Sequence, residues 1–295
     1  MRIGIDYNAA LHQRAGIGRY TRELFKALAA LDRENEYLLV ISGPAVRPGQ
    51  DFLPDAANFR PFYLLLGERW TTLLWQRLRL PLAIDWLTGS VDLFHSPDYV
   101  LPPLRRGVNK LLTIHDLSFL RYPEGAEPTL RWYLEGAVPR SVARADLLLA
   151  DSESTRRDLI DLFHVDPQRV EVIYPGVDER FRPLPDRARL QEVRRRYALD
   201  GPFILSVGTL EPRKNYPRLI EAFHRLRHDT HIPHRLVIVG GLGWRYAGVF
   251  RSVEQLGLQD EVRFLGHVPE EDLIALYNLC EAFAFVSLYE GFGLP

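Results

Sequence analysis

Short apolar runs alternate along the chain with longer amphipathic stretches. The runs are rich in valine, isoleucine, leucine and aromatic residues, as strands buried on both faces of a parallel sheet require. In the first part of the chain they predict strands at 2–6, 36–42, 59–66, 91–95, 110–115, 146–150 and 169–174. Helical spacing predicts helices at 18–31, 68–86, 129–143 and 152–163, the last with Ser152 as its N-cap. Such alternation indicates an α/β fold.

The alternation stops once, between Asp178 and Arg196. This segment is charged, contains Pro183 and Pro185, and has no strand pattern, so it predicts a linker that runs into a helix. Beyond it the pattern predicts strands at 203–207, 235–239, 262–265 and 282–287 and helices at 215–225, 246–256 and 270–279. We therefore expect two Rossmann-like domains, 1–178 and 200–295, joined by a linker and first helix at 179–199, with a cleft between the domains.

Composition excludes several classes of protein. The 37 lysines and arginines nearly balance the 38 aspartates and glutamates, so no global field attracts nucleic acid, and an anionic ligand must be held by local charges. The single cysteine, Cys280, lies among apolar residues; it excludes an internal disulfide and fits a reducing compartment. Asp6 interrupts the first apolar run, and no run approaches the roughly 18 residues of a membrane span. We expect a cytoplasmic protein.

Two adjacent cations, Arg213 and Lys214, stand where the predicted helix 215–225 begins, after the strand 203–207 and the glycine that breaks it, Gly208. Positive charge at a helix N-terminus opposes the helix dipole and costs about 0.3–1 kcal/mol unless an anion lies there. The pair is either an anion site or a solvated basic pair, and the conflict with local preference favours the site.

A glycine pair, Gly16 and Gly18, opens the first helix, where free backbone N–H groups suit an anion. A tight turn explains the pair equally well. The three-glycine dinucleotide fingerprint is not completed, because Thr21 stands at its next position.

The last predicted strand is followed by Glu290, two glycines and Pro295. Glycine at the carboxyl end of a strand lets backbone approach a ligand, and Pro295 fits the first turn of a further helix. We therefore expect a ligand site here, and a second domain that is incomplete.

Taken together, these segments resemble the group 1, or GT4-type, retaining glycosyltransferases of GT-B fold, with similarity greatest to mannosyltransferase-like members. The resemblance covers nearly the whole chain. It is carried by segments 16–18, 113–116, 174–178, 208–215, 239–241, 264–268 and the terminal motif around Glu290.

The resemblance implies that the C-terminal domain binds a nucleotide-sugar and that the N-terminal domain faces the acceptor. The donor diphosphate is assigned to Arg213 and Lys214, with Gly16 and Gly18 reaching it from the other domain. Glu290 matches the first glutamate of an E-x7-E motif and, with His115, is assigned to catalysis. The remaining assignments are the donor sugar to the backbone of Gly291, Phe292, Gly293 and Leu294, and the nucleobase to His267 and Val268.

On the acceptor side the residues leave alternatives open. Taken alone, His115 is a structural histidine at a strand end; the resemblance instead places it against the transferring sugar. Asp116 either orients that histidine or caps the following turn. The segment 95–99, which begins with His95 and includes Asp98, either shapes the acceptor pocket or packs as a loop.

The implied reaction is front-face transfer with retention, without cofactor or metal, because Arg213 and Lys214 replace a divalent cation. We expect GDP-mannose as donor and a glycan or lipid-linked acceptor. Two departures weaken donor binding: the second glutamate of the motif would lie beyond Pro295, and Thr209 stands where some relatives carry an arginine. A truncated, inactive nucleotide-sugar-binding or scaffold protein is therefore an alternative.

An NAD-dependent oxidoreductase with tandem Rossmann domains is a third possibility, against which the incomplete glycine fingerprint and the Arg213–Lys214 pair argue. Helix 68–86 adds a question of location. Its arginines and tryptophans suit either a bilayer interface or a core-packing helix that Pro81 interrupts. The interfacial reading predicts a peripheral contact at the inner face of the plasma membrane.

Overall fold

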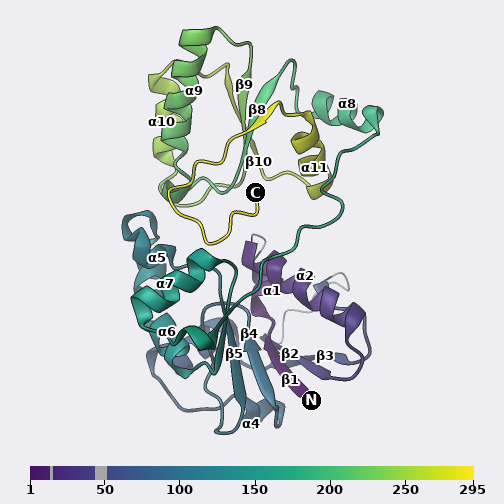
Figure 1. Cartoon of the computed structure of the whole chain (residues 1–295), viewed down its shortest axis with the longest axis vertical. Coiled ribbons are helices and arrows are strands. Elements are labelled where there is room, and N and C mark those ends of the chain that lie inside the picture. The colour runs from purple at the N-terminus through teal and green to yellow at the C-terminus, as the bar shows by residue number, and fades with distance from the viewer. Residues whose placement is uncertain (14–15, 44–51) are drawn as a thin grey trace. The chain divides into compact units, whose positions relative to one another are not determined.

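The computed structural model describes residues 1–13, 16–43 and 52–295 (Figure 1). Contacts divide the chain into two compact units. The first unit comprises residues 1–117 and 129–175, and the second comprises residues 118–128 and 176–295. The chain thus passes into the second unit after Pro175, close to the boundary expected at 178. The assignment of 118–128 to the second unit was not expected from the sequence.

The first unit is built on a parallel seven-stranded sheet of order β3-β2-β1-β4-β5-β6-β7. Its strands are β1 (Arg2–Asp6), β2 (Glu36–Ser42), β3 (Phe59–Leu64), β4 (Leu93–Ser96), β5 (Asn109–Ile114), β6 (Leu147–Ala150) and β7 (Val170–Val172). Its helical segments are α1 (Asn8–His12), α2 (Gly16–Leu31), α3 (Glu68–Thr72), the π-helical turn η2 (Leu73–Arg77), α4 (Asp85–Thr88), α6 (Pro128–Arg144), α7 (Glu153–Phe163) and η4 (Pro167–Arg169).

Helices pack on the sheet through their apolar faces. Phe25 and Ala29 of α2 are buried in one cluster with Ile5 of β1 and Ile41 of β2. The predicted N-cap of α7 is confirmed, since the Ser152 hydroxyl accepts a hydrogen bond from the Thr155 N–H at 3.1 Å. The near-continuous apolar strands are therefore buried as the sequence predicts.

The second unit contains a parallel four-stranded sheet of order β10-β9-β8-β11. Its strands are β8 (Phe203–Val207), β9 (Arg235–Val239), β10 (Val262–Gly266) and β11 (Ala282–Phe283). Its helical segments are α5 (Ser118–Arg121), η3 (Pro123–Gly125), α8 (Arg187–Arg196), η5 (Pro212–Lys214), α9 (Tyr216–Thr230), α10 (Ala247–Gln255) and α11 (Glu270–Leu279). In both sheets the strand order reverses beside the first strand of the unit, so each sheet has a topological switch point.

The segment 118–128 is tied into the second unit by backbone carbonyls. The indole Nε1 of Trp244 donates to the carbonyl of Gly125 at 2.8 Å, and the Arg245 guanidinium donates to the carbonyl of Glu124 at 3.0 Å. Neither contact involves a side chain of the segment itself, which explains why residue types there did not indicate the attachment.

The prediction of a single helix at 68–86 is wrong. The chain instead forms α3, widens into the π-helical turn η2, and leaves helical geometry before Pro81. Arg79 has a left-handed φ of 55°, which an α-helix does not allow. Proline disfavours helix in the residue before it and offers no N–H, so the break has a local cause.

The last strand is shorter than predicted, because β11 ends at Phe283 rather than at Ser287. Beyond it the backbone bonds the turn after β8: the Leu288 N–H donates to the Arg213 carbonyl at 2.8 Å. Residues 8–12 form the short helix α1, in a segment for which the sequence predicted neither helix nor strand.

Candidate functional site

The carboxyl end of β8 supplies the first part of the candidate site. Gly208 and Gly240 directly follow the adjacent strands β8 and β9 and have φ values of 156° and 153°. A Cβ on Gly240 would lie 1.9 Å from the Gly208 carbonyl oxygen, so this close contact requires glycine. The chain after Gly208 can then turn through η5 into α9.

The structure brings Arg213, Lys214 and Glu290 together. Arg213 donates to Glu290 Oε2 at 2.5 Å, and Lys214 Nζ donates to Glu290 Oε1 at 2.6 Å. The Arg213 side chain is 18% exposed and that of Lys214 is 12% exposed, so the two cations are not a solvated basic pair. Both cations come from the turn after β8, and the carboxylate comes from the segment after β11. These two strands flank the switch point.

A second carboxylate joins this cluster from the same turn. Glu211 Oε1 lies 2.7 Å from Arg213 Nη2, and its side chain is 5% exposed. Burial raises the pKa of Glu211, although Arg213 and Lys214 oppose the shift. Burial also raises the pKa of Glu290, but there the same two cations and the hydrogen bonds to the carboxylate prevail, and the pKa is lowered.

The terminal segment is fixed to the cation turn by several contacts. Asn215 Nδ2 donates to the carbonyl of Val286 at 3.3 Å, and Lys214 Nζ lies 5.4 Å from the centroid of the Phe285 ring. With the Leu288 bond described above, these contacts hold the Glu290 loop against η5. The Glu290 loop and the turn that carries the two cations therefore support each other structurally.

The other predicted donor residues lie nearby in the chain but differ in burial. Gly291 is buried, whereas Phe292 and Leu294 are 42% and 45% exposed. Gly293 has a positive φ of 96°. In the segment after β10, His267 is exposed while Val268 is buried in the core, so Val268 can face a nucleobase only with its backbone.

The predicted His115 follows β5 in the first unit and is held at both ring nitrogens. Nδ1 lies 2.6 Å from Asp151 Oδ2, and Nε2 lies 2.8 Å from the Pro97 carbonyl oxygen. Tyr20 and Tyr99 contact the ring edge-to-face, with centroid distances of 4.8 and 5.9 Å. The residue that orients the histidine is Asp151, and Asp116, for which that role was considered, lies half-buried beside it in sequence.

Burial lowers the pKa of His115, but the hydrogen bond and charge of Asp151, with Pro97 and Asp98, outweigh burial and raise it. Both ring nitrogens face acceptors, so the cationic ring fits this environment. The sequence offered one signal for Asp151, which was overlooked: it directly follows the strand 147–150, on the edge that carries His115.

His95 is a core residue of the first sheet. Its Nε2 lies 2.9 Å from the Thr113 hydroxyl, and its ring meets Phe25 edge-to-face. Burial, with the charge of His115, lowers its pKa to about 3, so the ring is neutral. The packing alternative is favoured for His95.

The glycines that open α2 have different surroundings. A Cβ on Gly18 would lie 1.8 Å from the Gln13 carbonyl oxygen, so Gly18 is required by the contact of α2 with the segment before it. A Cβ on Gly16 would meet nothing within 4 Å. The diphosphate role of both glycines stays a prediction.

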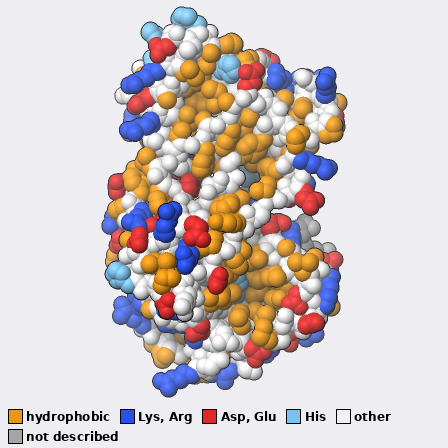
Figure 2. Space-filling view, viewed as in Figure 1, with side chains coloured by type: hydrophobic (Ala, Val, Ile, Leu, Met, Phe, Trp, Pro, Cys, Tyr) orange, Lys and Arg blue, Asp and Glu red, His pale blue; other side chains and the backbone are white. Residues whose placement is uncertain are grey.

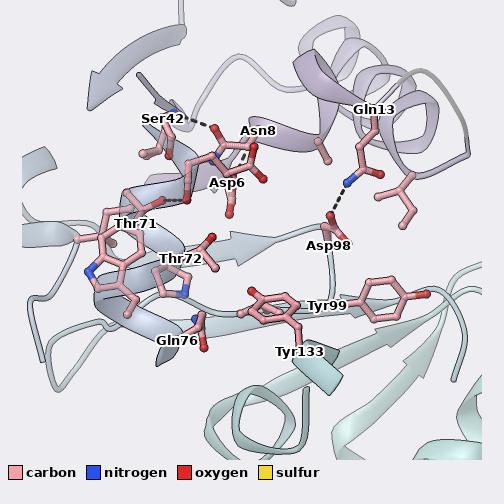
Figure 3. Close-up of a pocket in the computed structure, with 18 of the residues that line it drawn as sticks. Asp6, Asn8, Gln13, Ser42, Thr71, Thr72, Gln76, Asp98, Tyr99 and Tyr133 are labelled. Atoms are coloured by element: carbon pink, nitrogen blue, oxygen red, sulfur yellow. Dashed lines mark hydrogen bonds between the residues drawn. The ribbon is translucent and has the colours of Figure 1, made fainter. Parts of the chain in front are cut away.

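A cavity of about 420 Å³ lies in the first unit at the carboxyl ends of β1, β2 and β4. Figure 3 shows Asp6 and Asn8 on one side of an open centre and Tyr133 on the other, with Gln76 and Asp98 at its flanks. Gln13 Nε2 donates to Asp98 Oδ2 at 2.8 Å, and Asn8 Nδ2 donates to Asp6 Oδ1 at 2.7 Å. The segment 95–99, which was considered for an acceptor pocket, contributes Asp98 and Tyr99 to this cavity. The other walls come from distant segments and were not predicted.

Charges elsewhere are dispersed: Figure 2 shows basic and acidic side chains interspersed on the face in view. Within the described ranges, no group of three or more histidine, cysteine or carboxylate side chains has a metal-binding arrangement. None of the described helices is long and apolar enough to cross a bilayer.

Comparison with known proteins adds the family. The model for glycosyl transferases group 1 matches residues 191–295, and that for glycosyltransferase family 4 matches residues 14–181. O-antigen chain mannosyltransferase B of Escherichia coli is 31% identical over 290 residues, covering 95% of this chain and 74% of that protein. The D-inositol 3-phosphate glycosyltransferase of Salinispora arenicola is 36% identical over 229 residues, covering 70% of this chain and 50% of that enzyme.

Among solved structures, Anabaena HepE in complex with UDP and glucose matches with a TM-score of 0.69 at 19% identity, covering 99% of this chain and 76% of HepE. A likeness at this identity shows the fold, and it confirms the predicted GT-B architecture. The family matches also remove the oxidoreductase alternative. The chain belongs to the group 1 glycosyltransferases of glycosyltransferase family 4.

Proposed function

We propose that this glycosyltransferase moves mannose from GDP-mannose to a hydroxyl of a glycan or lipid-linked acceptor. The observation that carries the proposal is the cluster in which Arg213 and Lys214 share Glu290. Two fixed cations at a switch point suit the diphosphate of a nucleotide-sugar. The name of the related O-antigen mannosyltransferase supports mannose, and the UDP in the HepE structure makes UDP-sugars the necessary comparison.

In the proposed step the bond between the anomeric carbon and the diphosphate oxygen breaks while the acceptor oxygen bonds the same face of the sugar. The acceptor proton passes to the leaving diphosphate, so the products are a retained glycoside and GDP. Arg213 and Lys214 stabilise the charge that grows on the leaving oxygen, in place of a divalent cation. No step requires a metal or another cofactor.

The proposal gives the remaining residues specific roles. Glu290 holds both cations in place, and with Gly291 to Leu294 it would face the donor sugar. His115 has both nitrogens engaged, so it would act as a fixed positive charge rather than as a base. His267 and the backbone of Val268 would lie against the nucleobase.

A thermal-shift comparison of GDP, UDP, ADP and NAD tests the donor. GDP should stabilise most, by about 2.7 kcal/mol at a hundred times its dissociation constant. Incubation with GDP-mannose and an oligomannoside should release GDP, with and without EDTA, and NMR should show the anomeric configuration of the donor in the product. Inversion, or loss of transfer in EDTA, would contradict the mechanism.

Variants K214A and R213A test the cluster, with R218A as control because Arg218 is exposed on the adjoining helix α9. Each of the first two should lower kcat by about 10²–10³-fold, as loss of one transition-state contact typically does. Unchanged GDP binding and turnover in both would show that these cations do not hold the diphosphate. Stabilisation by GDP without product would favour the inactive binding or scaffold alternative.

We also propose a peripheral contact of the first unit with the inner face of the plasma membrane. Trp70 and Trp132 are 59% and 65% exposed, and the Arg77 guanidinium lies 5.9 Å from the Trp132 ring centroid. Exposed tryptophan beside arginine suits the headgroup region. Wild-type protein should sediment with phosphatidylglycerol vesicles more than with phosphatidylcholine vesicles, and the W70A/W132A variant should not. Equal behaviour of wild type and variant would overturn the contact.

A further inference from the structure

The cavity of the first unit lies at a position where α/β proteins bind ligands. Asp6 ends β1, Ser42 ends β2, and Asp98 follows β4, so the carboxyl ends of strands on both sides of the switch point form its floor. Thr72, Gln76 and Tyr133 close it from the helical side (Figure 3). Its volume of about 420 Å³ falls in the roughly 300–1,000 Å³ range of small-molecule sites.

The charges of this cavity have one sign. Its described lining includes the carboxylates Asp6, Glu68 and Asp98 and contains no lysine or arginine. Burial raises the pKa of Asp6 to about 6, with Asp98 and Glu68 adding to the shift against the hydrogen bonds of Asn8. Burial likewise raises the pKa of Asp98, although His115 and Gln13 oppose it. The described lining therefore offers no cation to a phosphate or carboxylate on a ligand, and each acid that is ionised would repel it.

The lining as a whole suits a polyhydroxylated ligand. Carboxylates accept hydrogen bonds from hydroxyls, while amides and hydroxyls of the wall both donate and accept. Apolar surface from Trp75, Ile17 and Leu134 is available to the C–H face of a sugar ring. These walls match the alternating donors, acceptors and apolar patches of a neutral saccharide.

We propose that this cavity binds an uncharged sugar residue of the acceptor, and that Asp6 and Asp98 are specificity-determining residues that reject acceptors phosphorylated or carboxylated on that sugar. The inference rests on the proposed function, because it assigns the substrate class to the same transferase. It goes further in naming the carboxylates that select the acceptor and the charge that they exclude.

Saturation-transfer NMR with methyl α-mannoside and with mannose 6-phosphate tests the proposal directly. The neutral mannoside should bind at least about tenfold more tightly, as one unfavourable charge contact of about 1.4 kcal/mol would produce. D6N and D98N should each weaken the binding of methyl α-mannoside and reduce the preference for it over mannose 6-phosphate. The D6N/D98N variant should bind mannose 6-phosphate better than wild type does. D55N is the control, since Asp55 is exposed and does not line the cavity.

Several outcomes would overturn the inference. Tighter binding of mannose 6-phosphate than of methyl α-mannoside would exclude the proposal, because that order is typical of a cationic site. Binding of mannosamine about tenfold tighter than that of methyl α-mannoside would also exclude it. If D98N does not fold, D6N and E68Q still test the wall, because Glu68 is exposed.

Thermal shift with GDP separates this inference from the proposed function. GDP should stabilise D6N and D98N as it does wild type, and K214A should still bind methyl α-mannoside. GDP binding without mannoside binding would overturn the acceptor site alone. Mannoside binding without GDP binding would overturn the proposed donor and leave the sugar site in place.

Discussion

The two sheets end in chemically opposite edges. At the switch point of the first sheet lie Asp6 and Asp98, which face a cavity without lysine or arginine in its described lining. At the switch point of the second lie Arg213 and Lys214, which share Glu290. The same backbone architecture therefore presents buried acids in one unit and cations paired with a carboxylate in the other.

The difference lies in how each edge balances its charges. In the second unit, cations and carboxylates neutralise each other across hydrogen bonds, so a diphosphate bound as proposed would compete with Glu290 for Arg213 and Lys214. In the first unit Asp6 and Asp98 accept hydrogen bonds from side-chain amides and have no cation beside them in the described lining, and burial raises the pKa of both acids. The fold provides a switch point in each unit, and the local side chains decide what can bind there.

The largest effect is expected at the His115–Asp151 pair of the first edge. D151A should lower the free energy of unfolding by about 3–5 kcal/mol, because it leaves a buried cation without its partner. Urea denaturation measures the loss, with D161A as control, since Asp161 is exposed on α7.

The same pair predicts a dependence on pH. The folded pKa of His115 is raised above its ordinary 6.5, so its stabilisation is complete below that value and is lost as pH rises through the folded pKa. D151N should flatten this slope. Equal slopes in wild type and D151N would show that the ion pair does not support this edge.

The edge of the second sheet depends instead on a close backbone contact between Gly240 and Gly208. G240A should destabilise the protein by about 1–3 kcal/mol, because its Cβ would meet the Gly208 carbonyl oxygen at 1.9 Å. G241A is a matched control, since a Cβ on Gly241 meets nothing within 4 Å. Calorimetry should separate the two variants, and identical melting temperatures would contradict the close contact.

A smaller gain in stability is expected at Asp6. Its folded pKa is raised from 3.8 to about 6, so ionisation costs stability as pH rises between these values. D6N avoids the cost and should be about 1–2 kcal/mol more stable than wild type above pH 6, with little difference near pH 4. Chemical denaturation at both pH values measures it, and an advantage at pH 4 equal to that above pH 6 would contradict the buried acid.

The smallest effect is expected at Glu211. E211Q removes a negative charge beside Arg213 and should tighten GDP binding about threefold to tenfold at neutral pH. Because burial raises the pKa of Glu211, wild type should approach the variant as pH falls. Titration calorimetry measures both, and E221Q, an exposed change on α9, should leave the affinity unchanged.

Local pattern predicted much of this molecule. Apolar runs located the strands because parallel strands are buried on both faces, and the dipole conflict at Arg213 and Lys214 indicated a paired site. The sequence pattern predicted a helix that continues past Pro81, because the arginines and leucines of 68–86 keep helical spacing on both sides of it. Asp151 and Tyr133 were missed for another reason, since their positions depend on strand order and helix packing.

The attachment of 118–128 to the second unit has a practical consequence for dissecting the protein. Neither unit is one continuous segment of the sequence, because the polypeptide passes between the units after Leu117, Pro128 and Pro175. A fragment that stops at Pro175 would carry residues 118–128 away from the indole of Trp244 that donates to Gly125. Expression of either half alone should therefore begin from a redesigned connection rather than from a simple cut.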